Sequence, residues 1–265
     1  MPRVLAFTNN KGGTGKSTLC ANCAFITAGL GFRVLLVDLT SQRTASTLLL
    51  GEVDDLPESD TVLAALTAHP QKHLEDLVFE GDKGVDVIPS HVLMAKAVVQ
   101  LMEVQTGKEQ ILQRELERVQ AEYDYIFLDS PGDLNILTAN VLVPCHAVLI
   151  PSRLNRTDFS CTETTLQFVR QASGYIGQRT ARVVLNMLDD RYLPEGIWSQ
   201  SHTGQLYQQA MQVFGDFLSP VTIPDSSDLR TAFDRGLTLM EYKPEAVTSQ
   251  RLQALVKQEV LREST

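Results

Sequence analysis

Apolar residues fall into two kinds of segment along the chain, short continuous runs and longer stretches with helical spacing. The short runs, typical of strands buried on both faces, are residues 4–8, 34–38, 85–88, 125–129, 147–151, 182–186 and 221–224. Helical spacing occurs over residues 16–30, 108–123, 134–143, 160–176, 203–214 and 248–262. This alternation predicts an α/β fold, a single doubly wound and mostly parallel sheet with helices on both faces.

No internal repeat divides the chain, and neither does a linker rich in glycine, proline or serine. We therefore expect one domain over residues 1–265, a length that can bury a large core. The acidic segment 51–60 and the stretches 67–84 and 189–201 are interpreted as surface connections, where α/β enzymes usually place specificity.

The amino-acid composition limits the class of protein and the cellular compartment that we expect. The chain has 265 residues, 43% hydrophobic and 21% charged, which excludes a disordered protein. It has no stretch of 18 apolar residues and no leader pattern at its start, so we expect a cytoplasmic protein.

Cys20 and Cys23 form a CxxC, but no second CxxC or nearby histidine completes a metal site, and we expect two small core residues. A reductase or metal-cluster carrier is the alternative for this pair.

The formal net charge is −9, the wrong sign for a protein that binds nucleic acid over its whole surface. Residues 1–150 contain 11 basic and 19 acidic side chains, whereas residues 151–265 contain 12 and 13. Any contact with a polyanion is therefore expected in the second half.

A glycine-rich segment, residues 9–18, lies between the first predicted strand and the first predicted helix. Gly12, Gly13 and Gly15 allow backbone N–H groups to surround phosphates, and Lys16 can reach the outer phosphate oxygens. Thr14 lies within the loop and Thr18 is expected at an inner phosphate. The pattern predicts a phosphate-binding loop.

Two apolar strands close on a carboxylate, one at Asp38 and one at Asp129. We expect both beside the phosphates. Ser17 would give a hydroxyl ligand to Mg²⁺, and Asp129 and Asp38 would each hold a water bound to that ion.

The run KGGTGKST at residues 11–18 resembles the deviant Walker A motif, KGGxGK[ST], of the ParA/MinD family of ATPases; Asn10 occupies the place of the first glycine of the standard motif. The order of motifs is similar over nearly the whole chain, most of all to partition ATPases of the ParA type. The resemblance implies a P-loop NTPase fold of the deviant Walker type and ATP and Mg²⁺ as cofactors.

The resemblance also implies partners. Lys11 matches the lysine that reaches the other subunit's nucleotide in an ATP-bound sandwich homodimer, so Lys11, Lys16 and Asp38 are the expected catalytic residues. A ParB-like adaptor that stimulates hydrolysis, non-specific DNA and a nucleoid-associated location in the cytoplasm are further expectations. The function implied is the partition or positioning of a plasmid, a chromosome or another cargo.

The motifs depart from the family pattern at two places near the expected phosphates. The family segment D-x-D-P-Q corresponds to residues 38–42, where Thr40 replaces the second acid, which positions or activates the attacking water in the family. Hydrolysis that is slow, or that depends more on a partner, is the hypothesis that follows. The loop D-x-P-P corresponds to residues 129–132, where Gly132 replaces the second proline and predicts a more flexible loop.

The base and DNA contacts are inferred from the second half. Asn186 matches the amide that recognises adenine, and Pro224 with Asp225 matches the segment that covers the base, although the family has an arginine at position 225. Candidate DNA-binding residues are Arg191, Arg230 and Arg235, and the basic residues of the tail are Lys243, Arg251, Lys257 and Arg262.

The tail offers a membrane alternative, because Leu252, Leu255, Val256 and Val260 share one helical face as in MinD-like relatives. This face lacks Phe and Trp, and we expect it to pack on the domain instead of a membrane. A nucleotide-switched regulatory or scaffolding protein, which needs neither DNA nor turnover, is the other alternative.

Overall fold

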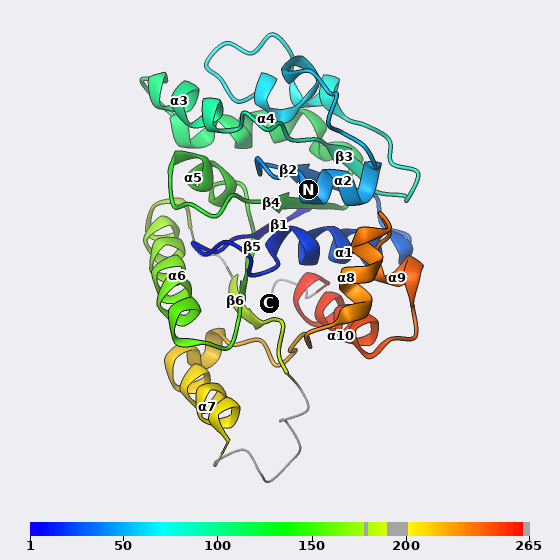
Figure 1. Cartoon of the computed structure of the whole chain (residues 1–265). Coiled ribbons are helices and arrows are strands. Elements are labelled where there is room, and N and C mark those ends of the chain that lie inside the picture. Colours follow the sequence, from blue (N-terminus) through cyan, green and yellow to red (C-terminus); the bar gives the residue numbers. More distant parts are fainter. Residues whose placement is uncertain (178–179, 190–200, 262–265) are drawn as a thin grey trace.

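Six of the seven predicted strands pair side by side in one parallel sheet (Figure 1). The computed structural model describes residues 1–177, 180–189 and 201–261. The strands are β1 (Arg3–Phe7), β2 (Val34–Asp38), β3 (Asp86–Ile88), β4 (Tyr125–Asp129), β5 (Ala147–Ser152) and β6 (Thr180–Leu185). Their order across the sheet is β3-β2-β4-β1-β5-β6, and every pairing is parallel. The predicted fold class is confirmed.

Helices cover both faces of the sheet. The α-helices are α1 (Lys16–Gly29), α2 (Thr44–Leu50), α3 (Ala95–Glu103), α4 (Ile111–Val119), α5 (Ile136–Leu142), α6 (Arg156–Ile176), α7 (His202–Phe214), α8 (Ser227–Asp234), α9 (Leu239–Tyr242) and α10 (Val247–Leu255). Short 3-10 turns are η1 (Glu58–Asp60), η2 (Val62–Ala64), η3 (Leu74–Leu77), η4 (Lys108–Gln110), η5 (Gln120–Glu122) and η7 (Gly215–Phe217), and α10 continues into a π-helical turn, η8 (Val256–Val260).

Alternate residues of each strand enter two separate apolar cores. In β1, Val4 and Ala6 face the core beneath α3–α7, whereas Leu5 and Phe7 face the core beneath α1, α2 and α8–α10. Both sides of every central strand are thus buried, which explains the continuous apolar runs in the sequence.

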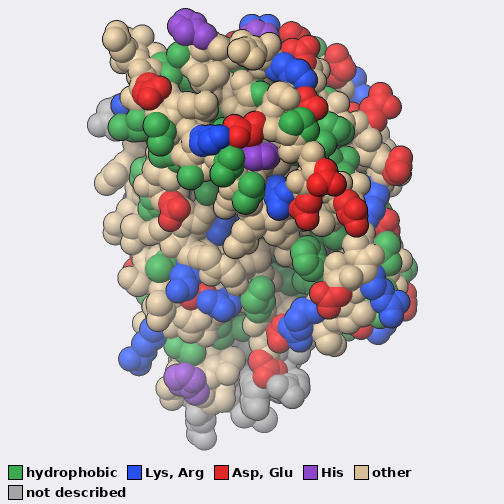
Figure 2. Space-filling model, turned by 45° about the horizontal axis from the view of Figure 1, so that its top comes forward, with side chains coloured by type: hydrophobic (Ala, Val, Ile, Leu, Met, Phe, Trp, Pro, Cys, Tyr) green, Lys and Arg blue, Asp and Glu red, His purple; other side chains and the backbone are tan. Residues whose placement is uncertain are grey.

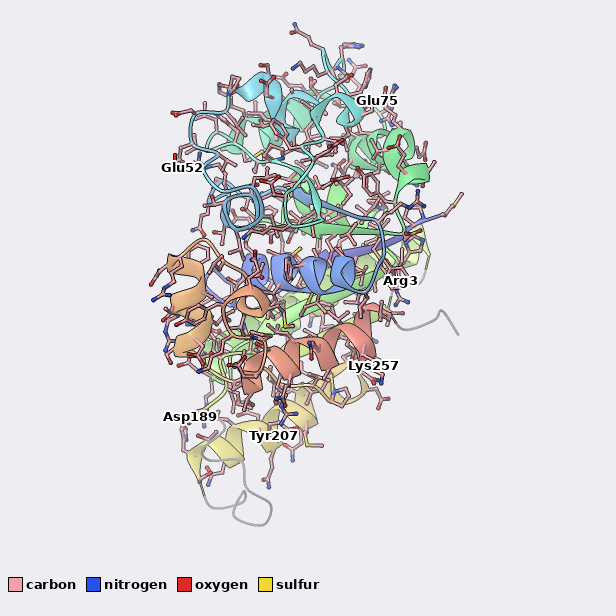
Figure 3. The ribbon with its side chains drawn as sticks, turned by 90° about the vertical axis from the view of Figure 1, so that its right-hand side faces the viewer. Arg3, Glu52, Glu75, Asp189, Tyr207 and Lys257 are labelled. Atoms are coloured by element: carbon pink, nitrogen blue, oxygen red, sulfur yellow. The ribbon has the colours of Figure 1, made fainter. Side chains whose placement is uncertain are left out.

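The tail belongs to the second core. Leu252, Leu255, Val256 and Val260 are all buried, and α10 lies alongside α1 with Lys257 on the outer side (Figure 3). The expectation that this face packs on the domain is confirmed. Arg262 lies outside the described residues. In the described part of the chain, no helix has the length and apolar character needed to span a bilayer.

Some predicted elements are wrong. Residues 221–224 do not form a strand: beyond the edge strand β6 they make one bridge, Leu188 to Pro224, and the N–H of Ile223 donates to Leu185 O at 2.8 Å. The helix predicted over residues 108–123 is present over residues 108–122, as α4 with a 3-10 turn at each end, η4 and η5. Helices α2, α3, α8 and α9 were not predicted, because each is too short for a clear period.

The register brings the two predicted acids together. β4 lies between β1 and β2, and Asp38 is the direct partner of Asp129, which is also level with Phe7. The chain leaves β1 at this same edge and turns into α1. The carboxyl edge of a parallel sheet is where α/β proteins bind ligands.

Candidate nucleotide-binding site

The loop between β1 and α1 needs glycine at its last position. Gly13 and Gly15 have φ values of 73° and 90°, which favour glycine. A Cβ on Gly15 would lie 2.3 Å from Nδ2 of Asn186. Because α1 begins at Lys16, the N-terminus of this helix faces the loop, an arrangement suited to an anion.

Asn186, which directly follows β6, supports this loop through a side-chain contact. Its side chain is 3% exposed, and its Nδ2 donates to the carbonyl of Thr14 at 2.7 Å. The contact with adenine that the sequence predicted for Asn186 stays a prediction, and the structure adds a supporting role for the amide.

Lys16 lies inside the loop that it follows. Its ammonium donates to the carbonyl of Lys11 at 3.0 Å, and the side chain is buried. Burial lowers the pKa of Lys16, and the negative charges of Asp129 and Asp133 oppose this shift. A buried cation beside a glycine-rich loop, at the N-terminus of a helix, is suited to a phosphate chain.

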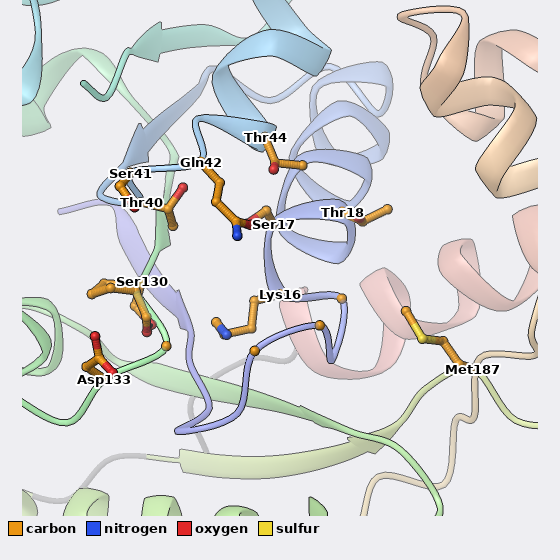
Figure 4. Close-up of a pocket in the computed structure, with 15 residues that line it drawn as sticks. Lys16, Ser17, Thr18, Thr40, Ser41, Gln42, Thr44, Ser130, Asp133 and Met187 are labelled. Carbon is orange, nitrogen blue, oxygen red and sulfur yellow. The ribbon is translucent and has the colours of Figure 1, made fainter. Parts of the chain in front are cut away.

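An open cavity of about 430 Å³ lies over the loop (Figure 4). Its lining residues are Gly12, Gly13, Gly15, Lys16, Ser17, Thr18, Thr40, Ser41, Gln42, Thr44, Ser130, Pro131, Gly132, Asp133 and Met187. Most of the predicted phosphate-binding residues are therefore brought together around one space. Asp133 and Met187 were missed by the sequence reasoning.

Asp38 is fully buried behind Thr40. Its Oδ1 accepts hydrogen bonds from the backbone N–H and the hydroxyl of Thr40, at 2.9 and 2.8 Å, and its Oδ2 accepts from those of Ser46, at 3.0 and 2.8 Å. Burial raises the pKa of Asp38, and these bonds oppose the rise. A carboxylate has about four acceptor sites, and four donors occupy them here. The predicted catalytic and metal-water roles of Asp38 would require one of these bonds to break.

Asp129 has the opposite surroundings. Its side chain is fully buried, yet neither oxygen accepts a hydrogen bond of normal geometry from the described residues. Burial and the charge of Asp38 raise its pKa well above the usual range, while the nearby Ser17 hydroxyl and Lys16 ammonium lower it. An unpartnered buried carboxylate near a hydroxyl fits a hydrated Mg²⁺, which prefers oxygen ligands and keeps several waters.

The loop after β4 approaches the phosphate loop closely. The Ser130 hydroxyl donates to Phe7 O at 2.9 Å. A Cβ on Gly132 would lie 3.6 Å from Nζ of Lys16, an ordinary contact. The hydroxyl of Thr138 donates to the carbonyl of Asp133, which ties the loop to the first turn of α5. The sequence signal for Asp133 was an acid directly after the D-x-P-G run.

Asn186 contacts the phosphate loop, whereas the other predicted base and DNA residues that the structure describes do not line the cavity; these are Pro224, Asp225, Arg230 and Arg235. The N–H of Asp225 donates to Leu188 O at 2.9 Å, and its carboxylate pairs with Arg230 at 2.5 Å. The guanidinium of Arg235 lies over the ring of Tyr242, 5.1 Å from its centre. Arg191 lies outside the described residues.

The two cysteines of the CxxC lie in the second core, as expected. Cys20 and Cys23 are fully buried, and burial raises the pKa of both thiols. Within the described ranges, no group of three His, Cys, Asp or Glu side chains is placed to hold a metal. The structure favours packing over thiol chemistry here.

A parallel sheet with a glycine loop after β1, and acids at the ends of the two adjacent strands, defines a P-loop nucleotide-binding protein. A family model described as an AAA domain matches residues 2–179. The sporulation initiation inhibitor protein Soj of Bacillus subtilis (strain 168) is 30% identical over 247 residues, which cover 92% of each chain. The chain belongs to the ParA/MinD family of ATPases.

Two further comparisons give a second relative and a solved structure of the same fold. The chromosome partitioning protein ParA of Caulobacter vibrioides is 29% identical over 270 residues, 98% of this chain and 95% of that protein. The solved structure of cobyrinic acid a,c-diamide synthase from Mycobacterium smegmatis with bound ADP and magnesium has a TM-score of 0.79 at 22% identity, covering 97% of this chain and 93% of that one. This second likeness shows the fold alone.

Proposed function

We propose that the protein is a Mg²⁺-dependent ATPase that forms an ATP-bound sandwich dimer, binds DNA without sequence preference and positions a cargo. The observation that supports nucleotide binding best is the open cavity with buried Lys16 on its floor and the unpartnered carboxylate of Asp129 behind it. The solved neighbour with ADP and magnesium supports the choice of ligands. A cytoplasmic, nucleoid-associated location and a ParB-like adaptor belong to the same proposal.

The phosphate loop, the first residues of α1 and Asp129 would together hold the nucleotide and its Mg²⁺. Backbone N–H groups of the loop and the N-terminus of α1 face the phosphates, and Lys16 can exchange the Lys11 carbonyl for a phosphate oxygen. Ser17 and Asp129 would hold Mg²⁺, Asp129 through a water. The ion would neutralise charge that develops on the phosphate oxygens.

The side chain of Lys11 supports the dimer. No described residue accepts a hydrogen bond from its ammonium, although its backbone carbonyl is used by Lys16. A lysine without a partner at the rim of a phosphate site is available to a second nucleotide, and the attraction is largest when the γ-phosphate is present. ATP would therefore favour the dimer and ADP would release it.

DNA binding would need several weak contacts. Basic and acidic side chains are interspersed on the face shown in Figure 2, without one large basic patch. Arg230 is already paired with Asp225, so each subunit offers little net positive charge there. Because phosphate contacts act additively through counterion release, a dimer that doubles their number binds far more tightly than a monomer.

Retention on DNA with ATP, ADP or no nucleotide, at low salt, tests the proposal. We expect retention with ATP only, and its loss in Lys11→Ala and Lys16→Ala; light scattering should show a dimer for the ATP-loaded wild type. Equal retention on DNA with ATP, with ADP and without nucleotide would refute the control of DNA binding by ATP. ATP-dependent dimers that do not bind DNA would instead support a nucleotide-switched regulatory protein, the second candidate, which the Asp225–Arg230 pair favours.

A further inference from the structure

We propose that Asp133 positions the water molecule that attacks ATP and that its carboxylate accepts the proton of this water. The family motif gives this task to an acid at the position where this chain has Thr40. This inference rests on the proposed ATPase function. Among the described residues that line the cavity, Asp133 is the one carboxylate. The motif comparison assigns it no role.

The other acids near the phosphates are occupied or buried. All four acceptor sites of Asp38 are used by Thr40 and Ser46. The hydroxyl of Thr40 donates to Asp38, and a hydroxyl is far too weak a base to take a proton from water. Asp129 is fully buried beside Ser17, where it suits the metal. The cavity therefore needs another acceptor if water is to be oriented.

Asp133 is held where it can fill this role. Its carbonyl accepts a hydrogen bond from Thr138 in the first turn of α5, and Asn135 caps that helix through bonds to the N–H groups of residues 137 and 138. Gly132, the residue before it, passes close to the Lys16 ammonium. A base mounted next to a capped helix is better positioned than one on a free loop.

The residues that line the cavity lie on both sides of Lys16. Figure 4 shows Lys16 between Asp133 on one side and Met187, which adjoins Asn186, on the other. A nucleotide with its base near Asn186 and its phosphates around Lys16 would direct its last phosphate toward Asp133. The charge of Asp133 also acts on Lys16, which agrees with this proximity.

The step balances without another reactant. The water oxygen forms a bond to the γ-phosphorus while the bond from that phosphorus to the β–γ bridging oxygen breaks, and ADP leaves with the electron pair. The water proton passes to the Asp133 carboxylate. Because Asp133 is exposed, it can return this proton to solvent after phosphate leaves. Phosphoryl transfer needs such a group mainly for orientation.

A purely electrostatic role for Asp133 makes a different prediction. If the carboxylate only balances the charge of Lys16, Asp133→Asn will tighten ATP binding and leave the turnover rate unchanged. If it positions water, the same change will lower kcat with an ATP affinity that is equal or tighter. The two roles are separated by measuring kcat and Kd on the same samples.

The test uses Asp133→Asn, Thr40→Asp, the double variant and, as a matched control, Asp216→Asn at an exposed acid remote from the cavity. Steady-state phosphate release gives kcat, and calorimetric titration with a non-hydrolysable MgATP analogue gives Kd. Acid–base residues contribute roughly 10²–10⁴-fold, so we expect Asp133→Asn to lose about tenfold or more in kcat. Thr40→Asp should restore much of the rate in the double variant, and Asp216→Asn should match the wild type.

Three results would overturn all or part of the inference. A kcat of Asp133→Asn within twofold of the wild type refutes the role of Asp133 and leaves the ATPase function standing, and failure of Thr40→Asp to restore any rate refutes the exchange of roles between the two positions. A wild type that binds the analogue but releases no phosphate from ATP refutes both hydrolysis and this inference.

Discussion

Replacing Asp129 by asparagine should stabilise the nucleotide-free protein and abolish its response to MgATP. The carboxylate is fully buried and accepts no hydrogen bond of normal geometry from the described residues. The change removes the charge and keeps the shape. Function and stability are thus opposed at this residue, because the group that would hold the metal has no partner when the metal is absent.

The size of the expected stability gain and its pH dependence both follow from the surroundings of Asp129. A buried charge without a partner costs more than a buried neutral amide, so removing the charge should raise the free energy of unfolding by about 1–3 kcal/mol. One kcal/mol corresponds to roughly 2–4 °C in Tm for a chain of this size. Folding raises the pKa of Asp129 above its ordinary value of 3.8. Its stabilising contribution is therefore complete below pH 3.8 and is lost as pH rises through the folded pKa.

Thermal unfolding of the wild type and Asp129→Asn between pH 4 and pH 8, with and without MgATP, is the assay. The Tm of Asp129→Asn should exceed that of the wild type, and this difference should grow as the pH rises. MgATP should raise the Tm of the wild type and leave that of the variant unchanged. Asp216 is an exposed acid, so the difference in Tm between Asp216→Asn and the wild type should not grow with pH. A variant that is less stable than the wild type at pH 8 would refute the reasoning about the unpartnered carboxylate.

Three other substitutions test separate parts of the site. Gly15→Ala should weaken ATP binding at least about tenfold in a calorimetric titration, because its φ of 90° and a contact at 2.3 Å exclude a Cβ. Ser46→Ala should lower the free energy of unfolding by about 1–3 kcal/mol in urea melts, since Asp38 loses a donor. Asp225→Asn should free Arg230, tighten ATP-dependent DNA retention and steepen its salt dependence; unchanged retention would exclude Arg230 from the DNA contact.

The sheet and the phosphate loop were predictable because each depends on local chemistry. Strands buried on both faces are continuous apolar runs, and a loop that wraps phosphates needs its glycines at fixed spacing. The run 221–224 has the same composition as a strand, but it lies past the edge of the sheet, where only isolated bonds form. Sequence alone does not show where the sheet ends.

The arrangement of acids in the site was not predictable, because it depends on contacts between distant residues. Ser46 reaches Asp38 from α2, a helix of seven residues that the pattern did not predict. Asn186 meets Thr14 across 172 residues. Only the folded sheet shows that Asp38 is fully hydrogen-bonded while Asp129, its neighbour in the register, has no partner of normal geometry among the described residues.

Thr40 and Asp133, which lie on two loops beside the phosphate site, are best understood together. Thr40 places a hydroxyl, not a carboxylate, in the wall of the cavity and uses it to hold Asp38, whereas Asp133 supplies a carboxylate on the loop after β4. The carboxylate that lines the cavity beside Lys16 therefore comes from the loop after β4 and not from the segment after β2. That loop continues into α5 through Thr138, so any movement of α5 in a dimer would also move the acid. Dimer formation would thereby control water attack directly, which an acid fixed at position 40 beside the buried end of β2 could not do as readily.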